Sequence, residues 1–224
     1  MDLSTLLQKM EVEARKRGAP VFLHSTKLEP FQVLIATILS ARTRDEQTAR
    51  AVERLFSRAK TVEDIAKMEI EEIEDLIRNV GFYRVKAKRI KELAEILSKR
   101  SFPETLEELL ELPGVGRKTA NILLSYLGKP AIAVDTHVHR ISNRLGLVKT
   151  KRPEETEEEL KKLFPKELWS KINYVFVGFG QTVCLPRKPI CDECPVSDVC
   201  KKVGVKGVSD ESVSKEYKRS RRKR

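Results

Sequence analysis

The chain has 224 residues, enough for one large domain or two smaller ones with a packed apolar core. Its 44 Lys and Arg residues exceed its 33 Asp and Glu residues and give a net charge of +11. This excess favours a polyanion such as nucleic acid as partner. The alternative is a charge-rich surface that serves solubility or heat tolerance. The first residues lack the apolar segment of a signal peptide and no apolar run approaches the roughly 20 residues of a membrane span, so we expect a soluble, intracellular protein.

Helical periodicity dominates the chain, and the expected elements follow in order from the N-terminus. Apolar stripes predict helices over residues 30–39, 45–56, 90–97, 106–110, 117–127, 135–145, 160–163 and 169–183. Pro30 suits a first helical turn, Asp45 is placed to cap the next helix, and Gly146 follows the end of a later one. The one β-like run, 131–134, is expected to be a buried connector. We therefore expect an all-α fold of about ten short helices joined by short loops.

The stretch ELPGVGRKTAN, residues 111–121, predicts a sharp turn between two helices. Pro113 lacks an N–H and ends the first helix, while Gly114 and Gly116 accept positive φ and leave the backbone uncovered. Successive N–H groups are then exposed beside the positive end of the helix that starts near Arg117, an arrangement that binds phosphate. LPGVG between helices resembles the helix-hairpin-helix motif, which grips the DNA backbone without reading sequence. The candidate DNA-binding residues here are Leu112, Gly114, Val115 and Gly116. The alternative is an ordinary turn with glycines for geometry.

Lys118 stands in the first turn of the helix after this hairpin. The positive end of the helix dipole disfavours an ammonium there, which enlarges the share of neutral, nucleophilic amine. Such an amine can attack the sugar C1′ of a damaged nucleotide and form a Schiff base. A lysine that binds phosphate or faces solvent fits the same spacing, so position alone leaves both interpretations open.

The four cysteines, Cys184, Cys191, Cys194 and Cys200, lie within 17 residues with the spacing C-x6-C-x2-C-x5-C. Two disulfides can form from this number, but an intracellular chain disfavours them. Zinc and a cubane iron–sulfur cluster both accept four thiolates. One short loop with a single C-x2-C pair favours the cluster, because most structural zinc sites use two such pairs, and zinc stays the alternative. Basic residues around the loop would present charge to phosphates.

Together, ELPGVGRKTAN, VDTHVHR at 134–140 and the cysteine pattern resemble the endonuclease III family of DNA glycosylases, in the helix-hairpin-helix superfamily. The three motifs keep the family's order and separation. The family removes oxidised pyrimidines from DNA and then cuts the strand at the abasic sugar. The resemblance implies Lys118 as the Schiff-base lysine, Asp135 as the catalytic aspartate, and a [4Fe–4S] cluster on the four cysteines. Asp135 would accept protons or stabilise positive charge on the sugar, and we also expect it to cap the helix from Thr136.

Three further residues are carried over from the resemblance. His137 is expected either to contact phosphate or to hydrogen-bond to backbone in the core. Arg42 stands where family members have glutamine, whose side chain fills the gap left by a flipped nucleotide; arginine can also fill it, which leaves the preference for the opposite base open. Phe82, in a segment similar to the family's wedge loop, is expected either to intercalate or to pack in the core. Basic residues after it are interpreted as phosphate contacts or a solvated helix face: Lys86, Lys88, Arg89 and Lys91.

The resemblance also implies two helical lobes with a DNA-binding cleft between them. A helical barrel with the hairpin covers residues 23–129, and the cluster lobe combines 1–22 with 130–224 and ends in a basic tail from about 204. The expected partner is double-stranded DNA with a damaged pyrimidine or an abasic site, bound by a monomer in the cytoplasm at the nucleoid, or in the nucleus of a eukaryote. Two alternatives remain: a base-only mismatch or adenine glycosylase of the same superfamily, and a non-enzymatic DNA-binding module with a zinc loop.

Overall fold

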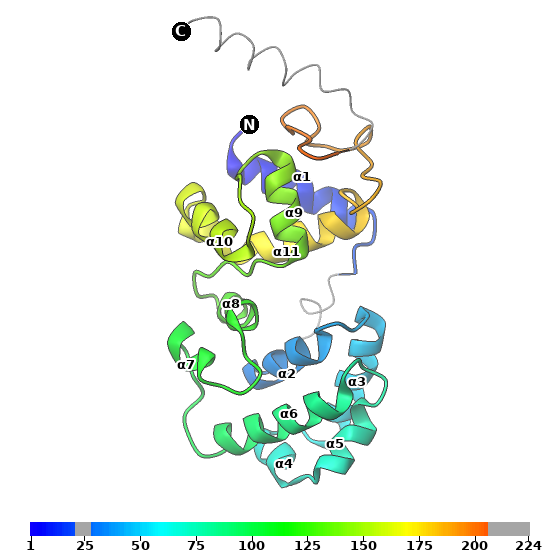
Figure 1. The fold of residues 1–224 in the computed structure, drawn as a ribbon, viewed down its shortest axis with the longest axis vertical. Coiled ribbons are helices and arrows are strands. Elements are labelled where there is room, and N and C mark those ends of the chain that lie inside the picture. The colour runs from blue at the N-terminus through cyan, green and yellow to red at the C-terminus, as the bar shows by residue number, and fades with distance from the viewer. Residues whose placement is uncertain (21–27, 206–224) are drawn as a thin grey trace, which may run out of the picture.

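The structure is a computed structural model that describes residues 1–20 and 28–205, and these residues form helices and loops without a strand (Figure 1). The elements are α1 (Leu3–Lys16), α2 (Pro30–Ser40), α3 (Asp45–Arg58), α4 (Val62–Lys67), α5 (Ile70–Ile77), α6 (Tyr83–Leu97), α7 (Leu106–Leu110), α8 (Arg117–Tyr126), α9 (Thr136–Leu145), α10 (Pro153–Leu163), the 3₁₀ turn η2 (Lys166–Leu168) and α11 (Trp169–Thr182). The all-α prediction is confirmed for this part of the chain. Almost all of the predicted basic tail lies outside it. No described helix is long and apolar enough to cross a membrane.

Local signals explain where several helices begin. Thr61 and Thr105 each accept a hydrogen bond from the backbone N–H three residues later, and the third helical residue bonds back to the cap, so α4 and α7 start in capping boxes. Pro30 occupies the first turn of α2, as predicted. The predicted cap at Asp45 is wrong by one residue: Asp45 is the first residue of α3, and Arg44 holds the N-cap position.

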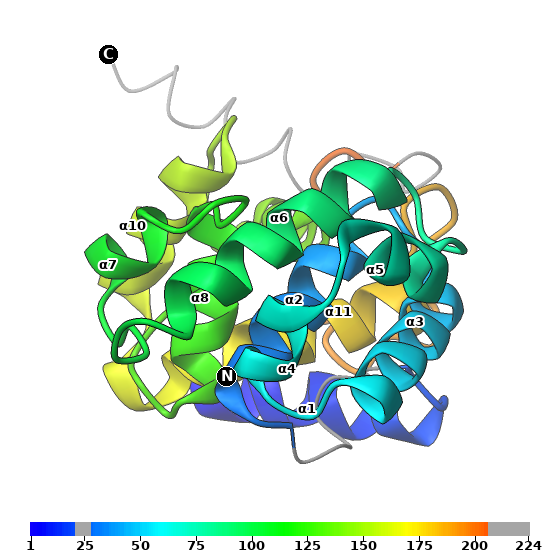
Figure 2. The ribbon, with the colours of Figure 1, turned by 90° about the horizontal axis from the view of Figure 1, so that it is seen from below.

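The first of two hydrophobic cores lies among α2 to α8, in the lower half of Figure 1. Its buried residues run from Val33 to Ala131 along the chain. Helix α2 is buried over the whole stretch Val33–Leu39, which makes it the central helix of this core. It lies at the centre of the view from below, and α3, α6 and α8 pack against it (Figure 2).

The second core lies among α1, α9, α10 and α11 and includes residues from both ends of the chain. Its members run from Leu6 to Met10 and from Ile132 to Val196, with Phe176 and Phe179 among its largest fully buried side chains. Helix α1 packs along α11, as Figure 1 shows, so the N-terminal helix is part of the same core as the C-terminal segment.

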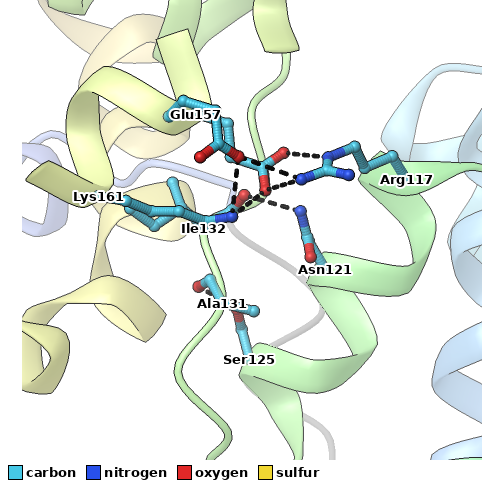
Figure 3. Close-up of polar contacts among 8 residues, drawn as sticks. Arg117, Asn121, Ser125, Ala131, Ile132, Glu157 and Lys161 are labelled. Atoms are coloured by element: carbon cyan, nitrogen blue, oxygen red, sulfur yellow. Dashed lines mark hydrogen bonds and ion pairs between the residues drawn. The ribbon is translucent and has the colours of Figure 1, made fainter. Parts of the chain in front are cut away.

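The chain changes from the first core to the second between Ala131 and Ile132. Residues 131–134 are non-helical and all buried, which confirms the predicted connector. Ser125 Oγ donates a hydrogen bond to Ala131 O over 2.8 Å, and Asn121 Nδ2 donates one to Ile132 O over 3.1 Å (Figure 3). The connector therefore runs back along α8 towards the start of that helix.

The next residue of the connector is held from the other side. Asn173 Nδ2 of α11 donates to Ala133 O over 2.8 Å. Helices α8 and α11 therefore both hydrogen-bond to neighbouring peptides of the buried connector. These hydrogen bonds join the two cores in addition to the apolar packing.

Candidate functional site

The turn between α7 and α8 has the hairpin shape predicted from its glycines. Leu112 N–H donates to Leu109 O and Val115 N–H donates to Leu112 O, each over 3.2 Å. The side chains of Leu112 and Val115 are buried, at 3% and 7% exposure. These two residues therefore anchor the hairpin in the first core, and their role as DNA contacts stays a prediction.

The two glycines of the hairpin are its exposed residues. Gly114 has φ 77°, a conformation that favours glycine, and a Cβ there would stand 2.8 Å from Arg89 Cδ. Gly116 caps α8 and has no neighbouring atom within 4 Å of an added Cβ. No described residue accepts from the N–H groups of Gly114 and Gly116, and those of the first turn of α8 lack intrahelical acceptors. The N–H groups of Gly114, Gly116 and the first turn of α8 are therefore free to bind a phosphate, whereas that of Val115 is already bonded. The Arg89 side chain lies beside Gly114.

Lys118 is exposed in the first turn of α8. The preceding residue, Arg117, reaches across to α10, where its Nε and Nη2 donate to the two carboxylate oxygens of Glu157 over 2.9 and 3.1 Å (Figure 3). Lys161 Nζ lies 2.7 Å from the same carboxylate. The turn of helix that carries Lys118 is therefore tied to the second core by a two-pronged ion pair.

Glu157 is almost completely buried, at 3% exposure. Burial by itself would raise the pKa of this carboxyl group, but hydrogen bonds from Arg117 and Lys161 outweigh it and hold the pKa below its ordinary value. Glu157 is therefore a carboxylate at neutral pH, and its charge is compensated by the two cations.

Asp135 ends the connector and caps α9, as predicted. Its Oδ1 accepts hydrogen bonds from the N–H groups of His137 and Val138, both over 2.9 Å. Because the connector runs back along α8, the chain reaches Asp135 while heading towards the helix end at which Lys118 stands. Asp135 is half-buried, and the two hydrogen bonds to Oδ1 fix the orientation of its carboxylate.

Behind Asp135, a chain of contacts leads to the cysteine loop. Arg140 Nη2 lies 3.2 Å from His137 Nδ1 and donates to Cys184 O over 3.0 Å. The His137 ring covers Gly180 of α11, where an added Cβ would come 2.3 Å from Nδ1. Burial lowers the pKa of the Arg140 guanidinium, which stays a cation because an arginine remains protonated at neutral pH in proteins. His137 was predicted either to contact phosphate or to hydrogen-bond to backbone in the core. Its contact with the Arg140 side chain does not decide between these two roles.

The four cysteines line one largely apolar pocket at the end of α11, together with Leu145, Phe179, Val196 and other side chains. All four thiols are free and half-buried. Burial, and then the mutual repulsion of the thiolates, raises the pKa of Cys194 to about 11. Such thiols ionise at neutral pH only when a cationic group compensates them, which fits four donors that surround a metal cluster.

Arg144 fixes the start of this loop. Its guanidinium donates to Leu185 O and Pro186 O over 2.7 and 2.6 Å, and Nη1 lies 3.5 Å from Cys184 Sγ. At the other end of the loop, Lys202 N–H donates to Cys200 Sγ over 3.3 Å. Donors aimed at sulfur stabilise thiolates, so the surroundings of the cysteines also suit a thiolate-bound cluster.

Arg42 and Phe82 lie side by side on the surface of the first core. Phe82 is 61% exposed, so the expectation that it packs in the core is wrong, and intercalation stays a prediction. The guanidinium carbon of Arg42 stands 5.7 Å from the centre of the Phe82 ring, within the range of a cation–π contact. Both residues have positive φ, 54° and 59°.

Two of the four lysines and arginines after Phe82 are neither phosphate contacts nor solvated. Lys86 is 5% exposed and donates to Leu39 O, Ala41 O and Thr43 Oγ1. Lys91 Nζ donates to two carbonyls at the end of α4. Burial lowers the pKa of Lys86 to about 8. Both lysines hold neighbouring backbone in place, which corrects the interpretation from sequence.

Comparison with known proteins identifies the family. The chain matches the HhH-GPD superfamily of base excision DNA repair proteins over residues 35–166, and the iron–sulfur binding domain of endonuclease III over residues 184–200. It is 55% identical over 177 residues to endonuclease III of Thermotoga maritima, which covers 77% of this chain and 83% of that relative. The chain belongs to the endonuclease III family.

Solved structures of endonuclease III have the same fold. A non-covalent endonuclease III–DNA complex is 36% identical with a TM-score of 0.78, over 89% of this chain and 94% of that one. A trapped endonuclease III–DNA covalent intermediate is 37% identical with a TM-score of 0.77, over 90% and 97% of the two chains. The cofactor of the cysteine loop is a [4Fe–4S] cluster, as the match over residues 184–200 and the donor set indicate.

The buried charges of this site were not predicted from the sequence. Lys86 lies on the same stripe of α6 as Ile90, and Glu157 lies on the same stripe of α10 as Leu160. A charged residue at a core-facing position of an amphipathic helix is the signal that could have found them. Arg140 lies inside the VDTHVHR motif but carries no signal of its contacts with distant residues.

Proposed function

We propose that this chain is a bifunctional DNA glycosylase and abasic-site lyase of base excision repair, which excises oxidised pyrimidines and cuts the strand on the 3′ side of the abasic site. One observation carries the proposal: Lys118 is an exposed amine in the first turn of α8, next to the open amides of the hairpin, in a chain of the endonuclease III family. A turn that holds the phosphate backbone would bring this amine close to a deoxyribose of the bound strand, and such proximity speeds a reaction between them.

Lys118 is the proposed nucleophile. Its neutral amine bonds to C1′ of an extruded nucleotide while the bond from C1′ to the base breaks, and the base leaves with a proton. The nitrogen lone pair then breaks the C1′–O4′ bond, O4′ takes up the proton that Asp135 removed from the amine, and a protonated Schiff base remains. The Schiff base acidifies the 2′ hydrogen. Loss of that proton and departure of the 3′ phosphate complete the β-elimination.

Asp135 is the proposed acid–base partner. Its carboxylate would take the proton that the amine loses and would stabilise positive charge as it develops on the sugar. Oδ1 is held by two N–H groups of α9, which fixes the orientation of the carboxylate. We therefore assign the proton transfer to Oδ2.

The cluster is proposed to be structural, with Cys184, Cys191, Cys194 and Cys200 as its ligands. Base excision needs no electron transfer, and a metal centre with four cysteine ligands has no open position for a substrate. When bound, the cluster supplies four sulfur cross-links to the loop. The chain's own basic residues in and after this loop would then face phosphates from a fixed position: Arg187, Lys188, Lys201 and Lys202.

The proposed lobes, residues 23–129 and residues 1–22 with 130–224, are each built around one of the two cores, with double-stranded DNA in a cleft between them. Extruding the damaged nucleotide costs a few kcal/mol, and less when the base is poorly stacked. Arg42 and Phe82 would enter the duplex where the nucleotide left it, and His137 is a further proposed phosphate contact. We expect a monomer that acts at the nucleoid in the cytoplasm, or in a eukaryotic nucleus, and sedimentation with and without DNA tests its oligomeric state.

A substrate panel with borohydride tests the proposed reaction. Duplexes with thymine glycol, uracil, 8-oxoguanine or an abasic site are each incubated with the protein, and covalent protein–DNA products are counted. We expect products with thymine glycol and the abasic site, and none with Lys118→Gln. Lys129→Gln is the matched control, because Lys129 follows α8 and pairs with Glu104 over 2.8 Å, away from the hairpin. Base release without any covalent product would favour a base-only glycosylase instead.

A further inference from the structure

Two exposed side chains of the first core stand on strained backbone. Arg42 and Phe82 have positive φ, and Lys202 is the only other described non-glycine residue that does. A residue with a Cβ adopts this conformation at a cost in free energy and keeps it only where its surroundings hold it. Neither side chain is held by burial, since both are exposed. The neighbouring backbone must therefore hold the two residues.

The two turns that carry Arg42 and Phe82 lie back to back. A Cβ at Gly81 would stand 2.8 Å from Arg42 O, so the backbone of one turn touches the backbone of the other. Gly81 N–H donates to Thr43 Oγ1 over 3.2 Å and links the turns directly. Gly81, which precedes Phe82, and Thr43, which follows Arg42, are thus hydrogen-bonded to each other.

Lys86 lies beneath both turns. Its ammonium donates to Leu39 O over 2.8 Å, to Ala41 O over 2.7 Å and to Thr43 Oγ1 over 3.0 Å, so all three hydrogens are used. Leu39 O belongs to the end of α2, where carbonyls lack intrahelical partners and the helix dipole favours a cation. The other two acceptors belong to the residues immediately before and after Arg42.

We propose that Lys86 is a positioning residue for the duplex side of the DNA site: it holds Arg42 and Phe82 as one rigid two-pronged element that enters the base stack. This inference rests on the proposed function, because it assigns a use to the two exposed side chains. Rigidity matters since a prong that is already ordered loses little conformational entropy when it replaces the extruded nucleotide. Arg42 and Phe82 can act only where a second DNA strand and a stack of base pairs are present. Loss of Lys86 should therefore slow the reaction on duplex DNA and not on single-stranded DNA.

A second lysine of α6 provides the control. Lys91 Nζ donates to Ala66 O over 2.6 Å and to Met68 O over 2.7 Å, which is similar chemistry on the same helix. These carbonyls lie at the end of α4 and belong to neither of the two turns that carry Arg42 and Phe82. Lys91→Met removes a comparable set of hydrogen bonds from the first core but leaves both prongs in place.

The experiment measures single-turnover Schiff-base capture with borohydride on one abasic oligonucleotide, single-stranded and in duplex, with the protein in excess. For Lys86→Met, which removes all three hydrogen bonds, we expect the duplex rate to fall at least about tenfold, the equivalent of one charge-assisted hydrogen bond, while the single-strand rate stays within about twofold of wild type. Lys91→Met should keep the wild-type ratio of the two rates. Equal losses on both substrates, or no loss on either, would overturn the proposal.

Two further variants separate positioning from general instability. Thr43→Val removes the oxygen that Lys86 and Gly81 share, and should lower the duplex rate selectively even if Lys86→Met does not fold. In a double-mutant cycle, Lys86→Met should cost little more in an Arg42→Ala, Phe82→Ala background, since its targets are already gone. Full additivity would contradict the proposal. A wild-type protein that captures neither substrate would instead overturn the proposed function.

Discussion

Removing the charge of Glu157 tests how firmly the helix of Lys118 is tied to the second core. Glu157→Gln keeps the volume of the side chain but leaves Arg117 and Lys161 without their buried counter-charge. A hydrogen bond to a charged group contributes about 1.5–3 kcal/mol, and Glu157 accepts three. The cations are partly exposed, at 41% and 24%, so water recovers part of the loss.

We therefore expect Glu157→Gln to lower the free energy of unfolding by about 2 kcal/mol, which corresponds to a fall in Tm of about 4–8 °C. Thermal unfolding followed by circular dichroism measures it. Glu158→Gln is the matched control: Glu158 also contacts Arg117, over 3.2 Å, but its side chain is 55% exposed. An exposed pair contributes at most about 1 kcal/mol, so this control should melt close to wild type.

The same variant should show a distinctive pH dependence. The pKa of Glu157 in the folded protein lies below its ordinary value of 4.5, so its stabilising contribution is complete above that pH and is lost as the pH falls through the folded-state value. The gap in Tm between wild type and Glu157→Gln should be full at pH 7 and should narrow below about pH 4.5. Equal Tm values at pH 7, or a gap that does not change with pH, would refute the assignment of this ion pair as an anchor of α8.

Three further predictions concern the cluster loop, the wedge and the connector. Cys194→Ser should give a colourless protein with weak DNA affinity, measured by its visible spectrum and by fluorescence anisotropy, and a brown variant with wild-type affinity would contradict a structural cluster. Phe82→Ala should raise the Kd for an abasic duplex about tenfold without changing Tm, because the side chain is 61% exposed; an unchanged Kd would remove Phe82 from the DNA site. Asn173→Ala should leave the buried Ala133 O without its donor and lower the free energy of unfolding by about 1–3 kcal/mol in a denaturant titration, and an unchanged midpoint would show that the connector does not need this bond.

The features that could be predicted from the sequence depend on interactions between residues that are close together along the chain. The hairpin was predictable because Gly114 and its neighbours control backbone conformation within a few residues. The cap at Asp135 was predictable for the same reason, since its oxygen reaches N–H groups only two and three residues away. The cysteine spacing likewise places its donors within one short loop.

The contacts that organise the site are not local. Lys86 bonds to residues 43 to 47 positions earlier, and Glu157 bonds to Arg117, 40 positions earlier. Charged residues are usually solvated, so composition predicts a surface position for both. Only the packing of α6 against α2, and of α10 beside α8, shows that these two charges are buried and compensated. Figure 3 shows the second case.

Mapping the captured adduct shows whether the Lys118 amine itself bonds to the sugar. The wild-type protein is reduced with borohydride on an abasic duplex, digested with protease and nuclease, and analysed by mass spectrometry. We predict a single modified peptide, with the reduced sugar on Nζ of Lys118. An adduct on any other amine, or efficient strand cleavage that leaves no adduct on Lys118, would rule out Lys118 as the nucleophile.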